Sequence, residues 1–263
     1  MRLFFKIVRL AIQQQMTYRM ALLAGLATNL FFGLLRAFVL VALYQGRGEV
    51  NDLTLRGAIT YVAFSQGMIA FLTIFGSYEV MQSVYTGSIG SDLLKPMPLF
   101  WMWLGRDLGR SLVNLVGRGV LLMLLFVPFF AIQLPETMGQ WLAMLLAMAL
   151  GWLVSYTWRF LANLAAFWSP DARGMGRIAF TAAQFFSGFL MPLRLYPEWF
   201  QQICYLTPFP ALFNTSAEAY LGLLRGPQLG LALLNQLVWF GVLAGLSHLV
   251  LTAGVRRLVI QGG

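Results

Sequence analysis

Long apolar runs, separated by short segments that contain polar residues, glycine or proline, make up most of this chain. A helix needs about 20 predominantly apolar residues to cross the hydrocarbon core of a membrane. The pattern predicts six such helices, at residues 21–43, 58–78, 111–130, 140–160, 177–192 and 229–251. The fold class expected is an all-α polytopic membrane protein, with residues 1–263 in a single transmembrane domain.

The first 20 residues have a different pattern. Arg2, Lys6 and Arg9 follow i, i+4 and i+7 spacing, which places them on one helical face, and apolar residues occupy much of the remainder. This pattern predicts an amphipathic helix that lies in the membrane interface with its cations toward lipid phosphates. The alternative is a helical cap exposed to solvent.

Composition supports the membrane interpretation. The chain is 59% hydrophobic and only 10% charged, whereas soluble domains are about 25% charged. A net charge of +9 would suggest a nucleic-acid partner in a soluble protein. Here the basic residues are distributed between apolar segments, so membrane topology explains them better and no nucleic-acid partner is expected.

The distribution of Lys and Arg predicts the orientation, because cytoplasmic connections carry the excess of these residues. Counted near the ends of spans, four precede the first span, four follow the second, three lie at or after the end of the fourth and two lie in the tail, whereas the alternate connections hold four in all. Both termini are therefore expected in the cytoplasm. The residues of the richer side are Arg2, Lys6, Arg9, Arg19, Lys95, Arg106, Arg110, Arg118, Arg159, Arg173, Arg177, Arg256 and Arg257, and those of the poorer side are Arg47, Arg56, Arg194 and Arg225.

The segment Glu79–Arg110 is the longest break in the apolar pattern on the predicted cytoplasmic side. It keeps apolar residues among its polar ones at spacings that fit one side of a short helix: Val80, Val84, Ile89, Leu93 and Leu94. Amphipathic helices often dock in grooves of other proteins, so this segment is the candidate partner site. The alternative is an ordinary solvated loop that leads into a helix anchored at the interface by Trp101 and Trp103.

The sequence lacks a site for ATP or a metal. Neither lysine, Lys6 or Lys95, closes a GxxxxGK[ST] phosphate loop. His248 and Cys204 are the sole histidine and the sole cysteine, so no clustered zinc site is expected. We predict that this chain is not an enzyme by itself and binds no cofactor.

Polar residues within the expected spans are few. Asn29 and Arg36 are candidates to line a path or a helix interface, although Arg36 lies toward the outer end, where snorkelling or pairing with another helix is favoured. His248 is expected to be packed or hydrogen-bonded, with a proton-relay role as the alternative. Gly241 and Gly245 form a GxxxG pair that could admit another helix. All nine acidic residues are assigned to span ends or loops, which disfavours proton-coupled transport.

Two stretches resemble the permease subunits of ABC-2 type exporters. Glu79 followed by GSIGSDLLKPMP is similar to the connection between the second and third spans of that family. SGFLMPLRLYPEWFQQICYLTPFP, at Ser187–Pro210, is similar to its signature between the fifth and sixth spans. With the N-terminal helix and six spans, the resemblance covers essentially the whole chain.

The resemblance implies a transmembrane permease that forms an export path, with ATP and Mg²⁺ on two separate ATPase subunits and a second permease, identical or homologous, as partner. It implies a multi-pass protein of the plasma membrane, here a bacterial inner membrane, whose first, second and fifth spans line the path and dimer seam. It also implies a coupling helix with Glu79, Val84, Ile89, Asp92, Leu93, Leu94, Lys95 and Pro96, and extracellular re-entrant helices with Ser187, Gly188, Pro192, Pro197, Trp199 and Pro208. The alternatives are a non-transporting membrane scaffold or assembly protein, and a proton-coupled carrier.

Overall fold

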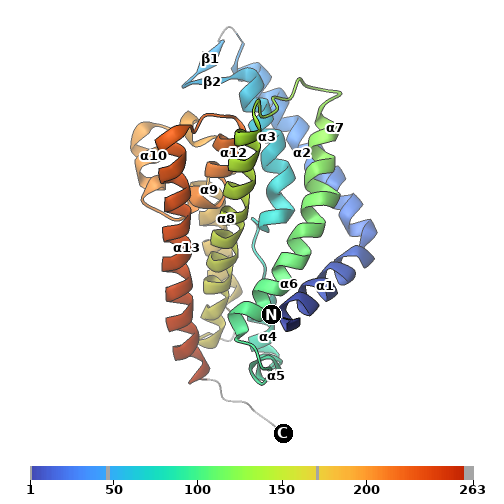
Figure 1. Ribbon diagram of the computed structural model, residues 1–263, viewed down its shortest axis with the longest axis vertical. Helices are drawn as coiled ribbons and strands as arrows, with labels where there is room; N and C mark the ends of the chain where they lie inside the picture. Colours follow the sequence, from blue (N-terminus) through green and yellow to red (C-terminus); the bar gives the residue numbers. More distant parts are fainter. Residues whose placement is uncertain (1, 46–47, 170–171, 258–263) are drawn as a thin grey trace.

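Long helices run alongside one another in the computed structural model, with a small hairpin of strands β1 and β2 at one end and the short helices α4 and α5 at the other (Figure 1). The structure describes residues 2–45, 48–169 and 172–257. Arg47, which entered the charge count, lies outside these ranges. The last long helix, α13, ends at the same end of the molecule as α4 and α5 (Figure 1).

The N-terminal segment is helical, as predicted: α1 spans Arg2–Thr17 and α2 spans Arg19–Leu43. Helix α1 packs along the first part of α6 (Leu99–Asn114). Gly109 of α6 allows this approach, because a Cβ atom there would lie 2.5 Å from the carbonyl oxygen of Val8. Arg2, Lys6 and Arg9 remain exposed on the other face of α1.

An antiparallel hairpin with two residues in each strand follows α2, where the sequence had predicted only a loop. Strand β1 is Glu49–Val50 and strand β2 is Leu53–Thr54. Asn51 and Asp52 form the turn with φ angles of 49° and 61°. Asn and Asp tolerate this left-handed conformation better than other non-glycine residues, and tight hairpins require it.

Helix α3 spans Leu55–Leu72, so the predicted span at 58–78 begins earlier and ends earlier than expected. The Thr54 hydroxyl caps its start by accepting from the backbone N–H of Gly57 at 3.1 Å. Thr73 ends the helix in a left-handed conformation with φ of 50°. The apolar composition continues past this point, and for that reason periodicity alone placed the end too late.

The predicted span at 111–130 is wrong at both ends. Helix α6 begins at Leu99 and continues through a π-helical segment, η1 (Leu115–Val120), into α7 (Leu121–Phe126), which makes a continuous helix of 28 residues. Arg106, Asp107 and Arg110 therefore lie within a helix rather than in a loop, and Arg118 lies in the π-helical segment. Pro128 explains the earlier end, because proline has no backbone N–H to donate to the preceding turn and so does not continue the helix.

The chain then forms α8, Met138–Asn163, extended by the 3₁₀ segment η2, Leu164–Phe167. Helix α9 spans only Arg173–Phe186, rather than the predicted 177–192. Its 14 residues measure about 21 Å at 1.5 Å per residue, less than the roughly 30 Å of a hydrocarbon core. The last long helix, α13, spans Gly226–Val255.

Short helices connect α9 to α13. They are η3 (Leu193–Leu195), α10 (Glu198–Tyr205), α11 (Phe209–Leu212) and α12 (Asn214–Tyr220). Helices α11 and α12 pack against α8, and every residue of α12 is buried. Phe213 meets Tyr61 and Phe64 of α3, so this broken segment forms part of the protein core.

Five helices in the described part of the chain are long and apolar enough to cross a membrane: Arg19–Leu43, Leu55–Leu72, Leu99–Phe126, Met138–Phe167 and Gly226–Val255. The prediction of an all-α polytopic membrane protein is thereby confirmed in its coarse form. A sixth crossing, which would have to use α9 and the residues after it, stays a prediction.

Candidate functional site

Helices α4 (Glu79–Tyr85) and α5 (Ile89–Leu93) form a compact unit at one end of the molecule, here called the elbow. Gly87, with φ of 75°, makes the sharp turn between them. The hydroxyls of Ser83 and Ser88 lie 3.1 Å apart across this turn, and Ile89 is completely buried. The elbow is therefore an ordered pair of helices rather than a solvated loop.

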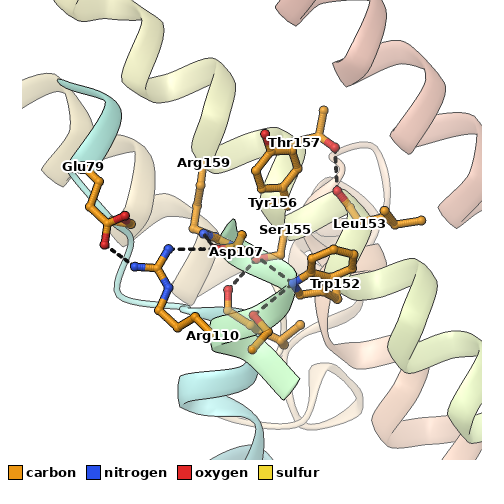
Figure 2. A network of polar contacts seen from close by, with 12 residues as sticks. Glu79, Asp107, Arg110, Trp152, Leu153, Ser155, Tyr156, Thr157 and Arg159 are labelled. Carbon is orange, nitrogen blue, oxygen red and sulfur yellow. Dashed lines mark hydrogen bonds and ion pairs between the residues drawn. The ribbon is translucent and has the colours of Figure 1, made fainter. Parts of the chain in front are cut away.

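An ionic network joins the elbow to α6 and α8 (Figure 2). At its centre is the buried carboxylate of Asp107 on α6, to which Arg159 of α8 donates two hydrogen bonds at 2.9 and 2.8 Å. Arg110 donates to the same carboxylate at 3.2 Å and also to Glu79, the first residue of α4. The indole Nε1 of Trp152 donates to Asp107 at 3.0 Å.

This geometry connects three helices through charged groups. A bidentate arginine–carboxylate pair is stronger and more directional than a neutral hydrogen bond. Removing one partner of a buried pair leaves an uncompensated charge, which costs about 3–5 kcal/mol. Asp107 and Arg159 thus fix α6 against α8, and Arg110 extends the same network to the elbow.

A second ionic group holds the other end of the elbow. Asp92 of α5 is buried, and its carboxylate accepts from the Lys95 ammonium at 2.6 Å and from the Arg106 guanidinium at 3.4 Å. Arg106 also lies over the indole ring of Trp103, 4.4 Å from its centroid. The two acidic residues of the elbow, Glu79 and Asp92, therefore both contact cations of α6.

The start of α4 has a third attachment, to the end of α8. Asn163 donates to the carbonyl oxygen of Ser77 at 2.7 Å and accepts from the backbone N–H of Met81 at 3.0 Å. One amide side chain thus satisfies two backbone groups at the beginning of a short helix. With the two ionic groups, it couples the position of the elbow to those of α6 and α8.

The candidate docking residues divide into two sets. Ile89 and Asp92 are buried, Val84 and Leu93 are partly buried, and their contacts lie within the protein. Leu94, Lys95 and Pro96 are exposed, and so is Glu79, although its carboxylate is paired. The most exposed apolar side chains of this region are Leu94 at 88% and Tyr85 at 68%, and Tyr85 was not among the candidates.

A comparison with protein-family models decides the family. The model described as ABC-2 family transporter protein matches residues 30–262, which include the elbow and all helices from α3 to α13. The chain is an ABC-2 family permease. It is an integral multi-pass membrane protein and a transport component of an ABC system rather than a catalyst itself. No individual curated protein matched the sequence.

At the opposite end of the permease, polar side chains surround the break after α9. Tyr61 of α3 donates to the carbonyl oxygen of Gly188 at 2.8 Å and lies 2.9 Å from the Asn214 amide oxygen. Gly188 has φ of 78°, and a Cβ atom there would lie 2.7 Å from the Tyr61 hydroxyl. The Ser187 hydroxyl accepts from the backbone N–H of Phe189 at 3.3 Å. The Ser-Gly pair therefore ends α9 through specific contacts.

The remaining signature residues occupy helix starts in the same region. Pro192, Pro197 and Pro208 immediately precede η3, α10 and α11. Proline has a fixed φ and no N–H, so it suits the first position or flank of a helix. Trp199 on α10 is 64% exposed.

Arg194, the middle residue of η3, connects the hairpin to the broken segment. It donates to the buried carboxylate of Glu218 at 2.8 Å and lies 3.7 Å from the Asp52 carboxylate. Burial alone would lower the pKa of Arg194, but the Glu218 carboxylate outweighs it and raises that pKa above its usual value. Burial and the same carboxylate raise the pKa of Tyr205 to about 12, so this phenol stays protonated at neutral pH.

Arg36 pairs within the permease. It donates to the carbonyl oxygens of Phe189, at 3.0 Å, and Leu190, which lie just after α9. Asn29 is buried and donates to the carbonyl oxygen of Gln66 at 3.3 Å. Asn29 thus contacts helix α3, whereas Arg36 is paired with backbone carbonyls after α9 rather than with another helix.

The three candidates on α13 lie on its outer face. A Cβ atom at Gly241 or Gly245 would meet open space, so neither glycine is needed for the close approach of another described segment. The His248 side chain is exposed in the described part of this chain, so the expectation that it is packed or hydrogen-bonded against a partner helix stays a prediction. Its backbone carbonyl accepts from the Thr252 hydroxyl at 2.8 Å.

Sequence reasoning missed the centre of the elbow network. Asp107, Arg159, Trp152 and Asn163 were not among the candidates, and the statement that all acidic residues lie at span ends or in loops is wrong for Asp107, which lies within α6. The signal was present: charged residues flanked by apolar helix-forming sequence are costly in a membrane protein unless they are paired. The charge count assigned Arg110 to the connection after the second span and Arg159 to the end of the fourth span, and it did not consider that Asp107 pairs with both.

Proposed function

We propose that this permease forms the translocation path of an ATP-driven exporter and couples to a separate ATPase through the elbow. In this proposal two ATPase subunits bind ATP and Mg²⁺, and a second permease, identical or homologous, completes the membrane domain. The observation that supports it best is the combination of two exposed apolar side chains of the elbow region, Tyr85 and Leu94, here called the elbow tip, with an ionic base, Glu79–Arg110–Asp107–Arg159.

The mechanism follows from these contacts. A partner that binds Tyr85 and Leu94 applies force to a unit with little freedom to move by itself, because Glu79 and Asp92 are paired with cations of α6. Displacement of the elbow is transmitted through Arg110 to Asp107 and from there to Arg159 of α8. Helices α6 and α8 would therefore reorient together during the transport cycle.

The proposed topology places the elbow and both termini in the cytoplasm of a bacterial inner membrane, and the hairpin with α10–α12 outside. The excess of Lys and Arg on the elbow side supports this orientation. In this arrangement α10–α12 are the extracellular re-entrant helices. The break after α9 is stabilised by Arg36, Tyr61 and Asn214, which supports a fixed outer structure above the path.

Co-purification tests the elbow as the docking site. The wild-type permease is tagged in its native membrane, and the ABC ATPase that co-purifies with it is quantified. Leu94→Glu is expected to reduce ATPase recovery at least tenfold, because it places a charge on the most exposed apolar side chain of the elbow. Met138→Glu is the matched control, since Met138 is 74% exposed and is the first residue of α8, a helix that begins at the end opposite to the elbow (Figure 1).

Three results would contradict the proposal. Equal recovery with Leu94→Glu and wild type would exclude the elbow tip as the dock. Loss of the ATPase in Met138→Glu to the same extent would indicate a general defect in assembly. Absence of any ATPase from the wild-type sample, with normal hydrolysis in its membranes, would favour the non-transporting scaffold.

A further inference from the structure

A groove of about 890 Å³ lies between α1 and the region that joins the elbow to α6. Its volume falls in the range of about 300–1,000 Å³ that is typical of small-molecule sites. Leu3, Ile7 and Leu10 of α1 line one wall, and Met97 and Met102 line the other. The groove therefore has long apolar walls. One of them is formed by α1, whose sequence pattern is that of a membrane-interface helix.

The polar part of the same groove is cationic. Lys95, Arg106 and Arg110 line it, together with a single carboxylate, that of Glu79. Arg110 is paired with Glu79, whereas Lys95 and Arg106 share the carboxylate of Asp92. The three cations at this end of the groove thus exceed their two acidic partners, Glu79 and Asp92, by one charge.

The side chains at this end of the groove also have N–H groups that can donate further hydrogen bonds. Lys95 uses one of its hydrogen-bonding directions on Asp92, and its side chain is 46% exposed. Arg106 makes only two long contacts, both of 3.4 Å, with that carboxylate. The indole Nε1 of Trp103, a buried residue that also lines the groove, has no acceptor among the described residues.

We propose that this groove binds an anionic phospholipid, with the phosphodiester beside Lys95 and Arg106 and an acyl chain along Leu3, Ile7 and Leu10. The phosphodiester carries one negative charge, which matches the excess of one positive charge at this end of the groove. A zwitterionic lipid carries an extra ammonium group that would face these cations unfavourably. This proposal rests on the groove and its charges, and it does not depend on docking of the elbow to an ATPase.

The test uses the purified full-length permease in a neutral detergent, without any ATPase, so that its outcome is separate from that of the docking experiment. Binding of dioctanoyl phosphatidylglycerol is titrated by thermophoresis and compared with dioctanoyl phosphatidylcholine and with glycerol 3-phosphate. We expect saturable binding of phosphatidylglycerol, at least fivefold weaker binding of phosphatidylcholine, and no binding of glycerol 3-phosphate at the same concentrations.

Two variant pairs locate the site. Lys95→Gln should weaken phosphatidylglycerol binding about fivefold, the effect of one basic residue near an anionic lipid. Lys6→Gln, which changes the only other lysine, on the outer face of α1, should leave it unchanged. Leu10→Gln should weaken binding, whereas Phe5→Gln, at an equally exposed position of α1 that does not line the groove, should not.

Equal affinity for the two phospholipids would overturn the proposal, and so would equal losses in Lys6→Gln and Lys95→Gln, because both results indicate unspecific adsorption. Binding of glycerol 3-phosphate as tight as that of the lipid would show a site for a soluble phosphate compound instead. Leu10 and Phe5 are both exposed, so the second pair remains informative if Lys95→Gln fails to fold.

Discussion

Replacement of Asp107 by asparagine tests the ionic network most sharply, because Asp107→Asn keeps the shape of the side chain and removes only its charge. Arg159, itself buried, loses the two charge-assisted hydrogen bonds of 2.9 and 2.8 Å that Asp107 accepts. One amide oxygen remains to accept from Arg159 or from Trp152.

The expected cost follows from this geometry. Loss of one partner from a buried ion pair costs about 3–5 kcal/mol. Because the asparagine retains one acceptor, we expect the lower end, about 3 kcal/mol, which is a factor of roughly 150 in the unfolding equilibrium. Glu79→Gln, in the half-exposed part of the same network, should cost less than about 1 kcal/mol.

Reversible unfolding of the purified permease in mixed micelles, followed by circular dichroism, measures both variants. The double variant Asp107→Asn with Arg159→Met should recover part of the loss, since it removes the uncompensated cation. If Asp107→Asn is as stable as wild type, or if Glu79→Gln costs as much as Asp107→Asn, the assignment of Asp107 as the buried centre of the network is wrong.

Three further predictions concern single contacts. Gly109→Val should separate α1 from α6, because a Cβ atom there would already lie 2.5 Å from a backbone oxygen. Protease should then cleave α1 more readily than in wild type. Gly117→Val is the control and should have no such effect, because a Cβ atom at Gly117 meets open space. Asn163→Leu should speed hydrogen exchange at the start of α4 at least tenfold, since two hydrogen bonds to backbone groups are lost; unchanged exchange would contradict the attachment. Gly188→Ala should lower thermal stability, because φ of 78° is strained for alanine and the Tyr61 hydroxyl would lie 2.7 Å from the new methyl group; a melting temperature equal to wild type would refute this.

The sequence predicted the long apolar helices well, because hydrophobic length is a strong signal in a membrane protein. It failed at ends that depend on backbone geometry. Thr73 ends α3 in a left-handed conformation while the composition remains apolar, and α6 starts at Leu99 although charged residues follow within it. No local pattern distinguishes a charged loop from a helix whose charges are paired by α8.

The sequence predicted only part of the candidate site, again because side-chain pairing between distant helices leaves no local pattern. Glu79 and Asp92 stood out as polar residues in an apolar chain, and the structure places both against cations of α6. Asp107, which shares Arg110 with Glu79, could not be assigned, because its pairing with Arg159 joins residues 52 positions apart. The inward direction of Ile89 and the outward direction of Leu94 also depend on how the elbow folds back onto α6.

Site-directed cross-linking tests the central proposal most directly. The sole native cysteine, Cys204, is completely buried, so Leu94→Cys introduces an exposed thiol at the tip of the elbow. In native membranes a thiol-to-amine cross-linker of short span should join Leu94→Cys, and not Met138→Cys, to the ABC ATPase. Cross-linking of the ATPase to Met138→Cys but not to Leu94→Cys would contradict both the proposed dock and the proposed orientation.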